Sequence, residues 1–126
     1  MTVDLQVKLI DFGSAVIVDP KGPRPYYDLF FGTNAYAPSE ILCKKAYQAP
    51  PAEIWTLGVL LSYLLTGTSP FLSEKDTIEG TITLNATTGA TLSGDVLDLM
   101  RRCLEPNPKH RADIREVKAH RWLNGG

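Results

Sequence analysis

The chain has 126 residues, with 13 lysines and arginines against 14 aspartates and glutamates, and 44% of its residues are hydrophobic. A chain of this length can bury roughly two-thirds of the surface that it exposes when unfolded, so we expect one domain with its own core rather than a disordered chain. The formal net charge of -1 excludes a general electrostatic attraction to nucleic acid or to an anionic membrane.

The first predicted elements are two short strands, at residues 5–10 and 15–18, where apolar residues alternate or cluster. Prolines at positions 20, 23 and 25 then predict a long loop up to Tyr36 with no further regular structure. Loops of more than about 12 to 15 residues are usually functional or disordered. Because this one carries Tyr26, Tyr27, Phe30 and Phe31, we expect an ordered, functional loop.

The remaining predicted elements are helical. Pro50-Pro51-Ala52-Glu53 begins a helix that Gly67 ends, and its apolar residues cover every side, so we expect it at the centre of the core. A short helix and a Thr/Gly-rich loop follow between residues 74 and 94. Ser93 caps a second long helix that ends before Pro106. The run Asp113-Ile114-Arg115-Glu116 resembles a capping box that opens a last helix, with Ile114, Val117 and Trp122 or Leu123 on its inner side.

Nothing in the sequence predicts secretion, a membrane span or a metal site made of cysteines. The longest apolar stretch, residues 54–65, is interrupted by polar residues and is shorter than the roughly 20 residues that cross a bilayer. Cys43 and Cys103 are far apart and have no metal-binding spacing, so we expect two reduced, buried thiols. These features predict an intracellular protein, located in the cytoplasm.

Several motifs occur in an order that carries a family resemblance. Asp11-Phe12-Gly13 follows the first strand, and Gly32-Thr33-Asn34-Ala35-Tyr36 and Glu40 follow the loop. Trp55 and Gly58 lie in the apolar helix, and the chain closes with the runs 107–111 (Asn-Pro-Lys-His-Arg) and 120–123 (His-Arg-Trp-Leu). This order resembles the large lobe of a eukaryotic protein kinase from the Asp-Phe-Gly motif to the end of the domain.

The resemblance covers residues 1–126 as one partial kinase domain, and it is greatest to PAS kinases and other calmodulin-dependent-type Ser/Thr kinases. It implies a mainly α fold, a large-lobe fragment with a short β-strand pair at the N-terminus and a long activation segment. The implied activity is phosphoryl transfer from Mg-ATP to Ser or Thr of a protein substrate.

For the site, the resemblance implies that Asp11 is a ligand of Mg²⁺ and so binds the ATP phosphates. Phe12 would hold Asp11 in place by packing into the core, and Gly13 would allow the turn. The alternative is an acidic residue that ends an ordinary strand. Thr33 and Tyr36 would lie in the peptide-docking part of the activation segment, with the Thr33 hydroxyl near the catalytic aspartate. No Ser or Thr lies between Ala15 and Gly32, so we expect aromatic packing, not phosphorylation of Thr, to order this loop.

Glu40 and Arg111 match a carboxylate and a guanidinium that form a buried ion pair in the family. Trp55, Gly58, His120 and Trp122 also match family positions, where we expect core packing or local hydrogen bonds. The sequence departs from the family in two places. The family's Ala-Pro-Glu aligns with Pro38-Ser39-Glu40, and the aspartate that begins the buried helix and holds the catalytic loop aligns with Glu53.

The 126 residues contain no counterpart of the family's glycine-rich phosphate loop, of the lysine on its small-lobe strand, or of its His-Arg-Asp catalytic loop. We therefore expect no catalytic base in this chain, no activity of the chain alone, and an apolar patch of the central helix open to water. The missing small lobe would be a partner. The alternative is a non-catalytic kinase remnant that binds another protein through the helix at residues 54–65. A third interpretation, a ubiquitin-like tail at Gly125-Gly126, has no support upstream of these residues.

Overall fold

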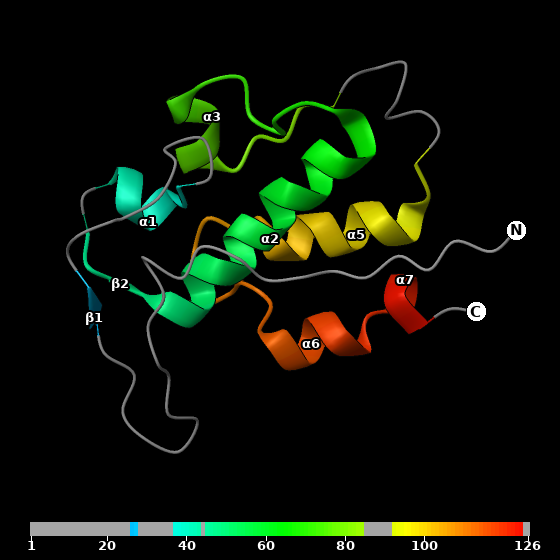
Figure 1. Ribbon diagram of the computed structural model, residues 1–126. Helices are drawn as coiled ribbons and strands as arrows, with labels where there is room; N and C mark the ends of the chain where they lie inside the picture. The colour runs from blue at the N-terminus through cyan, green and yellow to red at the C-terminus, as the bar shows by residue number, and fades with distance from the viewer. Residues whose placement is uncertain (1–25, 28–36, 44, 85–91, 125–126) are drawn as a thin grey trace, which may run out of the picture.

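The computed structural model describes residues 26–27, 37–43, 45–84 and 92–124. This part is mainly helical, as predicted (Figure 1). In chain order its elements are β1 (Tyr26–Tyr27), α1 (Ser39–Leu42), β2 (Tyr47–Gln48), α2 (Ala49–Thr66), α3 (Glu74–Glu79), α5 (Gly94–Cys103), α6 (Ile114–Ala119) and α7 (Arg121–Asn124). The strands predicted at residues 5–10 and 15–18 lie outside the described residues.

Helix α2 is the central element. It begins one residue before the predicted start, with prolines in its first turn, where the missing N–H groups cost no intrahelical bond. It ends where predicted, at Gly67, whose left-handed φ of 76° lets its N–H donate to the Tyr63 carbonyl. Figure 1 shows α2 crossing the molecule beside α5, with α1 and α3 on one side and α6 and α7 on the other.

The core lies where α2 packs on α5. One cluster joins residues of α2, α5 and the C-terminal segment, namely Ile54, Leu99, Cys103, Ala112 and Val117. A second cluster consists of Trp55, Val59, Met100 and Leu104. The two helices approach closely at Gly58, where an added Cβ would lie 2.8 Å from the Cys103 Cβ. Gly58 is therefore required by the contact between the helices rather than by its own backbone.

One face of α2 is open, although apolar residues lie on every side of the helix. Leu57, Leu60 and Leu64 are 38%, 42% and 74% exposed, and Glu53 is exposed on the same side. Their spacing of four, three and four residues places them along one stripe of the helix. This stripe is an apolar patch of the kind that the sequence led us to expect. We call these three leucines the leucine stripe.

The caps of α5 and α6 are formed by the predicted residues. Ser93 Oγ accepts from the Val96 N–H, and an Asp113 carboxylate oxygen accepts from the Glu116 N–H. The predicted inner side of the last helix is correct only for Val117, which is buried. Ile114 and Leu123 are both 53% exposed and Trp122 is 37% exposed. For Trp122 and Leu123 the reason is that α6 stops at Ala119, and the extended His120 breaks the helical phase before α7 begins. Ile114 lies in the first turn of α6, beside the pocket at the start of α2.

Two further predictions were wrong. Strand β1 lies in the segment predicted to be without regular structure, and it pairs antiparallel with β2, with Tyr26 opposite Gln48 and Tyr27 opposite Tyr47. Strands of two residues are too short to leave an alternating pattern in the sequence. Both cysteines are free thiols, but only Cys103 is buried, whereas Cys43 is exposed.

Candidate functional site

The structure brings Glu40 and Arg111 together, although they lie 71 positions apart in the chain. Arg111 Nη1 donates to Glu40 Oε2 over 2.9 Å, and Nη2 donates to Oε1 over 2.8 Å. The two side chains are 5% and 0% exposed, so water does not weaken the pair. This is the two-bond geometry in which the planar guanidinium matches a carboxylate.

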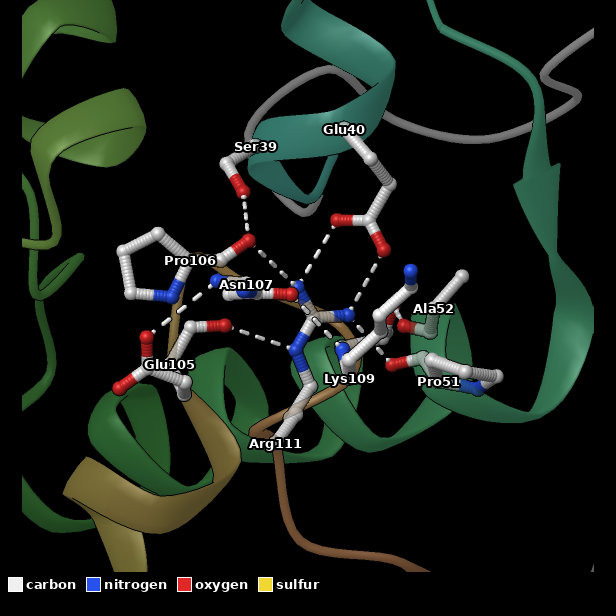
Figure 2. A network of polar contacts seen from close by, with 10 residues as sticks. Ser39, Glu40, Pro51, Ala52, Glu105, Pro106, Asn107, Lys109 and Arg111 are labelled. Carbon is white, nitrogen blue, oxygen red and sulfur yellow. Dashed lines mark hydrogen bonds and ion pairs between the residues drawn. The ribbon is translucent and has the colours of Figure 1, made fainter.

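Arg111 also binds three backbone carbonyls around the same point (Figure 2). Its Nε donates to Glu105 O, Nη1 donates to Pro51 O, and Nη2 donates to Pro106 O, over 2.9, 2.8 and 3.3 Å. A guanidinium has five N–H donors, and all five are used here. Arg111 therefore joins α1, the first turn of α2 and the loop after α5. We call Glu40, Arg111 and these carbonyls the arginine hub.

Trp55 lies against this hub. The Arg111 guanidinium carbon is 5.0 Å from the Trp55 ring centroid, which is within the range of a cation–π interaction. The Trp55 ring also stacks on Phe71, with the centroids 5.3 Å apart and the planes 8° from parallel. Trp55 is fully buried and packs in the core, as its family position led us to expect.

Ser39 adds a contact that the sequence reasoning missed. Its Oγ donates to Pro106 O over 2.6 Å, and the residue is only 4% exposed. Figure 2 shows this bond meeting the Arg111 bond at the same carbonyl. The only signal in the sequence was the departure from the family's Ala-Pro-Glu at this position.

A pocket of about 650 Å³ lies beside the hub, between the start of α2 and the start of α6. Pro50, Ile54 and Ile114 contribute apolar surface to it, and Glu53 and Lys109 are among its charged residues. Glu53 is exposed, so its carboxylate is available to another chain segment. This is the residue that aligns with the family's aspartate at the start of the helix.

A second polar cluster joins α5 to the C-terminal helices. His120 Nδ1 accepts from the Trp122 N–H over 3.1 Å, so the ring proton is on Nε2, which donates to Asp98 Oδ2 over 2.7 Å. Arg102 Nε donates to the same oxygen over 2.8 Å. These hydrogen bonds, that of His120 first and that of Arg102 second, lower the pKa of Asp98 below its ordinary value of 3.8.

Cys103 lies inside the α2–α5 contact and shows no sign of a chemical role. Burial raises the pKa of its thiol to about 11, because desolvation disfavours the thiolate, although the nearby Arg111 charge acts in the opposite direction. A thiol with a raised pKa is a poor nucleophile and a poor metal ligand at neutral pH. Cys103 is therefore a core residue.

The other predicted site residues, Asp11, Phe12, Gly13, Thr33 and Tyr36, lie outside the described residues. Within the part that is described, no group of three or more His, Cys, Asp or Glu side chains could hold a metal ion. The helices of that part are also too short or too polar for any of them to cross a membrane.

Comparison with known proteins gives one consistent family. The model of the protein kinase domain matches residues 1–123. The chain is 36% identical to calcium-dependent protein kinase 5 of Oryza sativa subsp. japonica, over 95% of this chain and 22% of that protein. It is 36% identical to an SNF-related serine/threonine-protein kinase of Rattus norvegicus, over 94% of this chain and 16% of that protein.

The chain is also 34% identical to sperm motility kinase 3A of Mus musculus, over 98% of this chain and 24% of that protein. It thus spans about a quarter or less of the length of these relatives. All three matches extend over nearly the whole chain, so the similarity is not confined to one motif.

Proposed function

The chain belongs to the protein kinase family, and from this premise we propose that it forms the C-terminal part of a serine/threonine kinase domain. The complete domain would transfer the terminal phosphoryl group of Mg-ATP to a Ser or Thr hydroxyl of a protein substrate. The observation that supports this function best is the arginine hub. It anchors the end of the segment at residues 11–40 to the helical core through a buried, fully bonded ion pair.

Asp11 is the residue that we assign to the metal. A carboxylate is a hard oxygen donor of the kind that Mg²⁺ prefers. When bound, Mg²⁺ neutralises charge on the phosphate oxygens of the nucleotide. Phe12 would fix Asp11 by packing in the core, and Gly13 would allow the chain to turn away from the site.

The residues between Asp11 and Glu40 would place the protein substrate. Thr33 and Tyr36 belong to the stretch just before α1, and α1 is held by the arginine hub. Because phosphoryl transfer depends mainly on positioning, a fixed end of this segment reduces the freedom that the substrate hydroxyl must lose. The Thr33 hydroxyl would hydrogen-bond near the proton-accepting aspartate of the rest of the domain.

The 126-residue chain by itself would be inactive, because none of its residues matches the family's catalytic base or phosphate loop. Its partners would be the rest of the kinase domain, including the small lobe, and a protein substrate. We place the complete protein inside the cell, in the cytoplasm, where ATP is available.

A chimera tests this function. Residues 1–126 would replace the corresponding segment of the kinase domain of the Oryza calcium-dependent relative, and transfer of labelled phosphate from Mg-ATP to a peptide would be measured. We expect the chimera to phosphorylate the peptide and the isolated chain not to. Asp11→Asn in the chimera should abolish the transfer while its circular dichroism stays unchanged.

The control variant is Asp76→Asn, which changes a carboxylate in the first turn of α3 and should leave the activity near that of the parent chimera. Turnover retained in Asp11→Asn would contradict the metal-ligand assignment. Label transferred by the isolated chain, purified free of other kinases, would contradict the proposal that it is only part of a domain.

The leucine stripe favours a second candidate, a non-catalytic kinase remnant that binds another protein. Three leucines in line on α2 leave apolar surface in water at a cost of roughly 25 cal/mol for each Å². In this case the partner would be a complementary kinase lobe, covering the stripe. Sedimentation of the chain together with such a lobe should then show a defined complex, and Leu60→Lys should abolish it. The chain should bind no Mg-ATP. Failure of the chain to form such a complex would exclude this candidate.

A further inference from the structure

Ser39 stands where the family's pattern has a proline, and its hydroxyl takes part in a closed set of contacts. Ser39 Oγ and Arg111 Nη2 both donate to the carbonyl oxygen of Pro106, over 2.6 and 3.3 Å. A carbonyl oxygen has two lone pairs, and both are used here. The adjacent residue, Glu40, binds Arg111 directly. Two neighbouring residues of α1 thus contact the arginine hub, Glu40 through the guanidinium and Ser39 through the Pro106 carbonyl.

Pro106 is itself held from another side. Gly80, which ends α3 with a φ of 76°, lies so close to the proline that an added Cβ would be 2.5 Å from Pro106 Cγ. The ring of Pro106 thus abuts the end of α3, while its carbonyl receives α1 and Arg111. The Ser39 hydroxyl therefore binds a fixed point of the structure rather than a mobile loop.

The second attachment matters for geometry. Helix α1 packs on α3, and the Glu40 side chain attaches it to Arg111. The bond of the neighbouring Ser39 adds a second, directional attachment to the hub, and Ser39 is buried, so water cannot replace this bond without opening the site.

We propose that Ser39 is a positioning residue, which acts through Pro106 and Arg111 to fix α1 and hence the segment that leads into it. This inference rests on the proposed function only in assigning substrate docking to that segment. We call the contact of the Ser39 hydroxyl with the Pro106 carbonyl, which Arg111 shares, the tether. The tether lies within the 126-residue chain and can be tested on that chain alone.

The test is amide hydrogen exchange of the 126-residue chain, measured residue by residue by NMR. In Ser39→Ala we expect exchange about three- to tenfold faster, the effect of losing one intramolecular hydrogen bond. The acceleration should appear at the Cys43 amide, which donates to Ser39 O, and also at the Arg111 amide, which donates to Asn107 O. Unchanged exchange at Arg111 would overturn the proposal.

Ser62→Ala is the matched control. Ser62 is fully buried, and its Oγ donates to a backbone carbonyl, Thr68 O, over 2.9 Å, but it lies outside the hub. This variant should leave the Arg111 amide as in the parent chain. If both variants accelerate exchange at Arg111 equally, the effect is a general loss of stability and Ser39 has no positioning role.

Two further measurements complete the test. If Ser39→Ala does not fold, Ser39→Thr and Ser39→Val are compared. The threonine and valine side chains have nearly the same shape, but only threonine keeps the hydroxyl. Faster exchange of the Arg111 amide in Ser39→Val than in Ser39→Thr supports the tether, and equal exchange overturns it.

In the active chimera, Ser39→Ala should raise the peptide KM about three- to tenfold and leave the ATP KM unchanged. An inactive parent chimera would count against the proposed function, whereas the exchange data would still decide the tether.

Discussion

The buried pair of Glu40 and Arg111 is the residue-scale feature with the largest expected effect on stability. Glu40→Gln keeps the size of the side chain but leaves the Arg111 charge buried without a carboxylate. Breaking a buried pair in this way costs about 3–5 kcal/mol of the free energy of unfolding. Urea denaturation of the full chain measures the loss.

The control for this substitution is Glu79→Gln at the exposed end of α3, which should change the free energy of unfolding by less than about 0.5 kcal/mol. Equal losses in the two variants would mean that Arg111 is stabilised without its carboxylate. In that case the three backbone carbonyls would account for its burial.

At the same scale, the family motifs identify Glu40 and Arg111 as a pair, but nothing in the sequence assigns a contact to Ser39, Pro106 or Asp98. The first two are recognisable because a carboxylate and a guanidinium at those places match a known pair. The bond of Ser39 ends on a backbone carbonyl 67 positions away, and any residue supplies a carbonyl. Such a partner leaves no trace in the side-chain types, so only the fold reveals it.

At the scale of elements, the contact between α2 and α5 depends on Gly58. In Gly58→Ala the new Cβ would approach Cys103 Cβ to 2.8 Å and Leu104 Cδ2 to 2.9 Å, so the helices must shift. We expect a net destabilisation of about 1–3 kcal/mol from overpacking, which exceeds the gain in helix propensity. The melting temperature should fall accordingly.

Gly94→Ala gives the opposite result if this explanation is correct. Gly94 lies at the start of α5 with no atom within 4 Å of an added Cβ, so only the gain in helix propensity remains. A melting temperature that is unchanged or higher is expected. A fall in both variants would show that glycine is needed for its backbone freedom and not for the approach of the helices.

The attachment of α7 to α5 should depend on pH through Asp98. Its pKa is lowered in the folded chain, so the carboxylate stabilises the fold at pH values above its ordinary pKa of 3.8. That contribution is lost as the pH falls below 3.8 and through the lowered pKa. The difference in unfolding free energy between the parent chain and Asp98→Asn should thus be present at pH 6 and shrink toward pH 3. A difference that stays constant over this range would contradict the assignment.

The elements themselves were predictable where a cap and a periodic apolar pattern agreed. Helices α2 and α5 were located from Gly67 and Ser93 together with their apolar residues. The last helix was predicted as one piece, because nothing in the residue types marks His120 as extended. The extended backbone of His120 goes with two contacts of its imidazole ring. One is a tertiary contact with Asp98, and the other is a local hydrogen bond from the Trp122 N–H.

At the scale of the whole molecule, the order of motifs along the chain predicted the family and the mainly helical fold. It did not predict which side of α2 is open, because an apolar residue looks the same in the sequence whether it is covered or exposed. Leu57 and Val59 are both apolar, yet one is 38% exposed and the other is fully buried. Val59 faces Met100 of α5 and the side chains that pack around it, whereas Leu57 lies on the open side of the helix.

The separation of 71 residues between Glu40 and Arg111 also has a consequence for folding kinetics. Helices form from neighbours in the chain, whereas this pair needs a long loop to close first, and loop closure costs entropy before any contact repays it. We therefore expect the pair to be absent from the folding transition state. Stopped-flow measurements on Glu40→Gln should show much faster unfolding and a nearly unchanged folding rate.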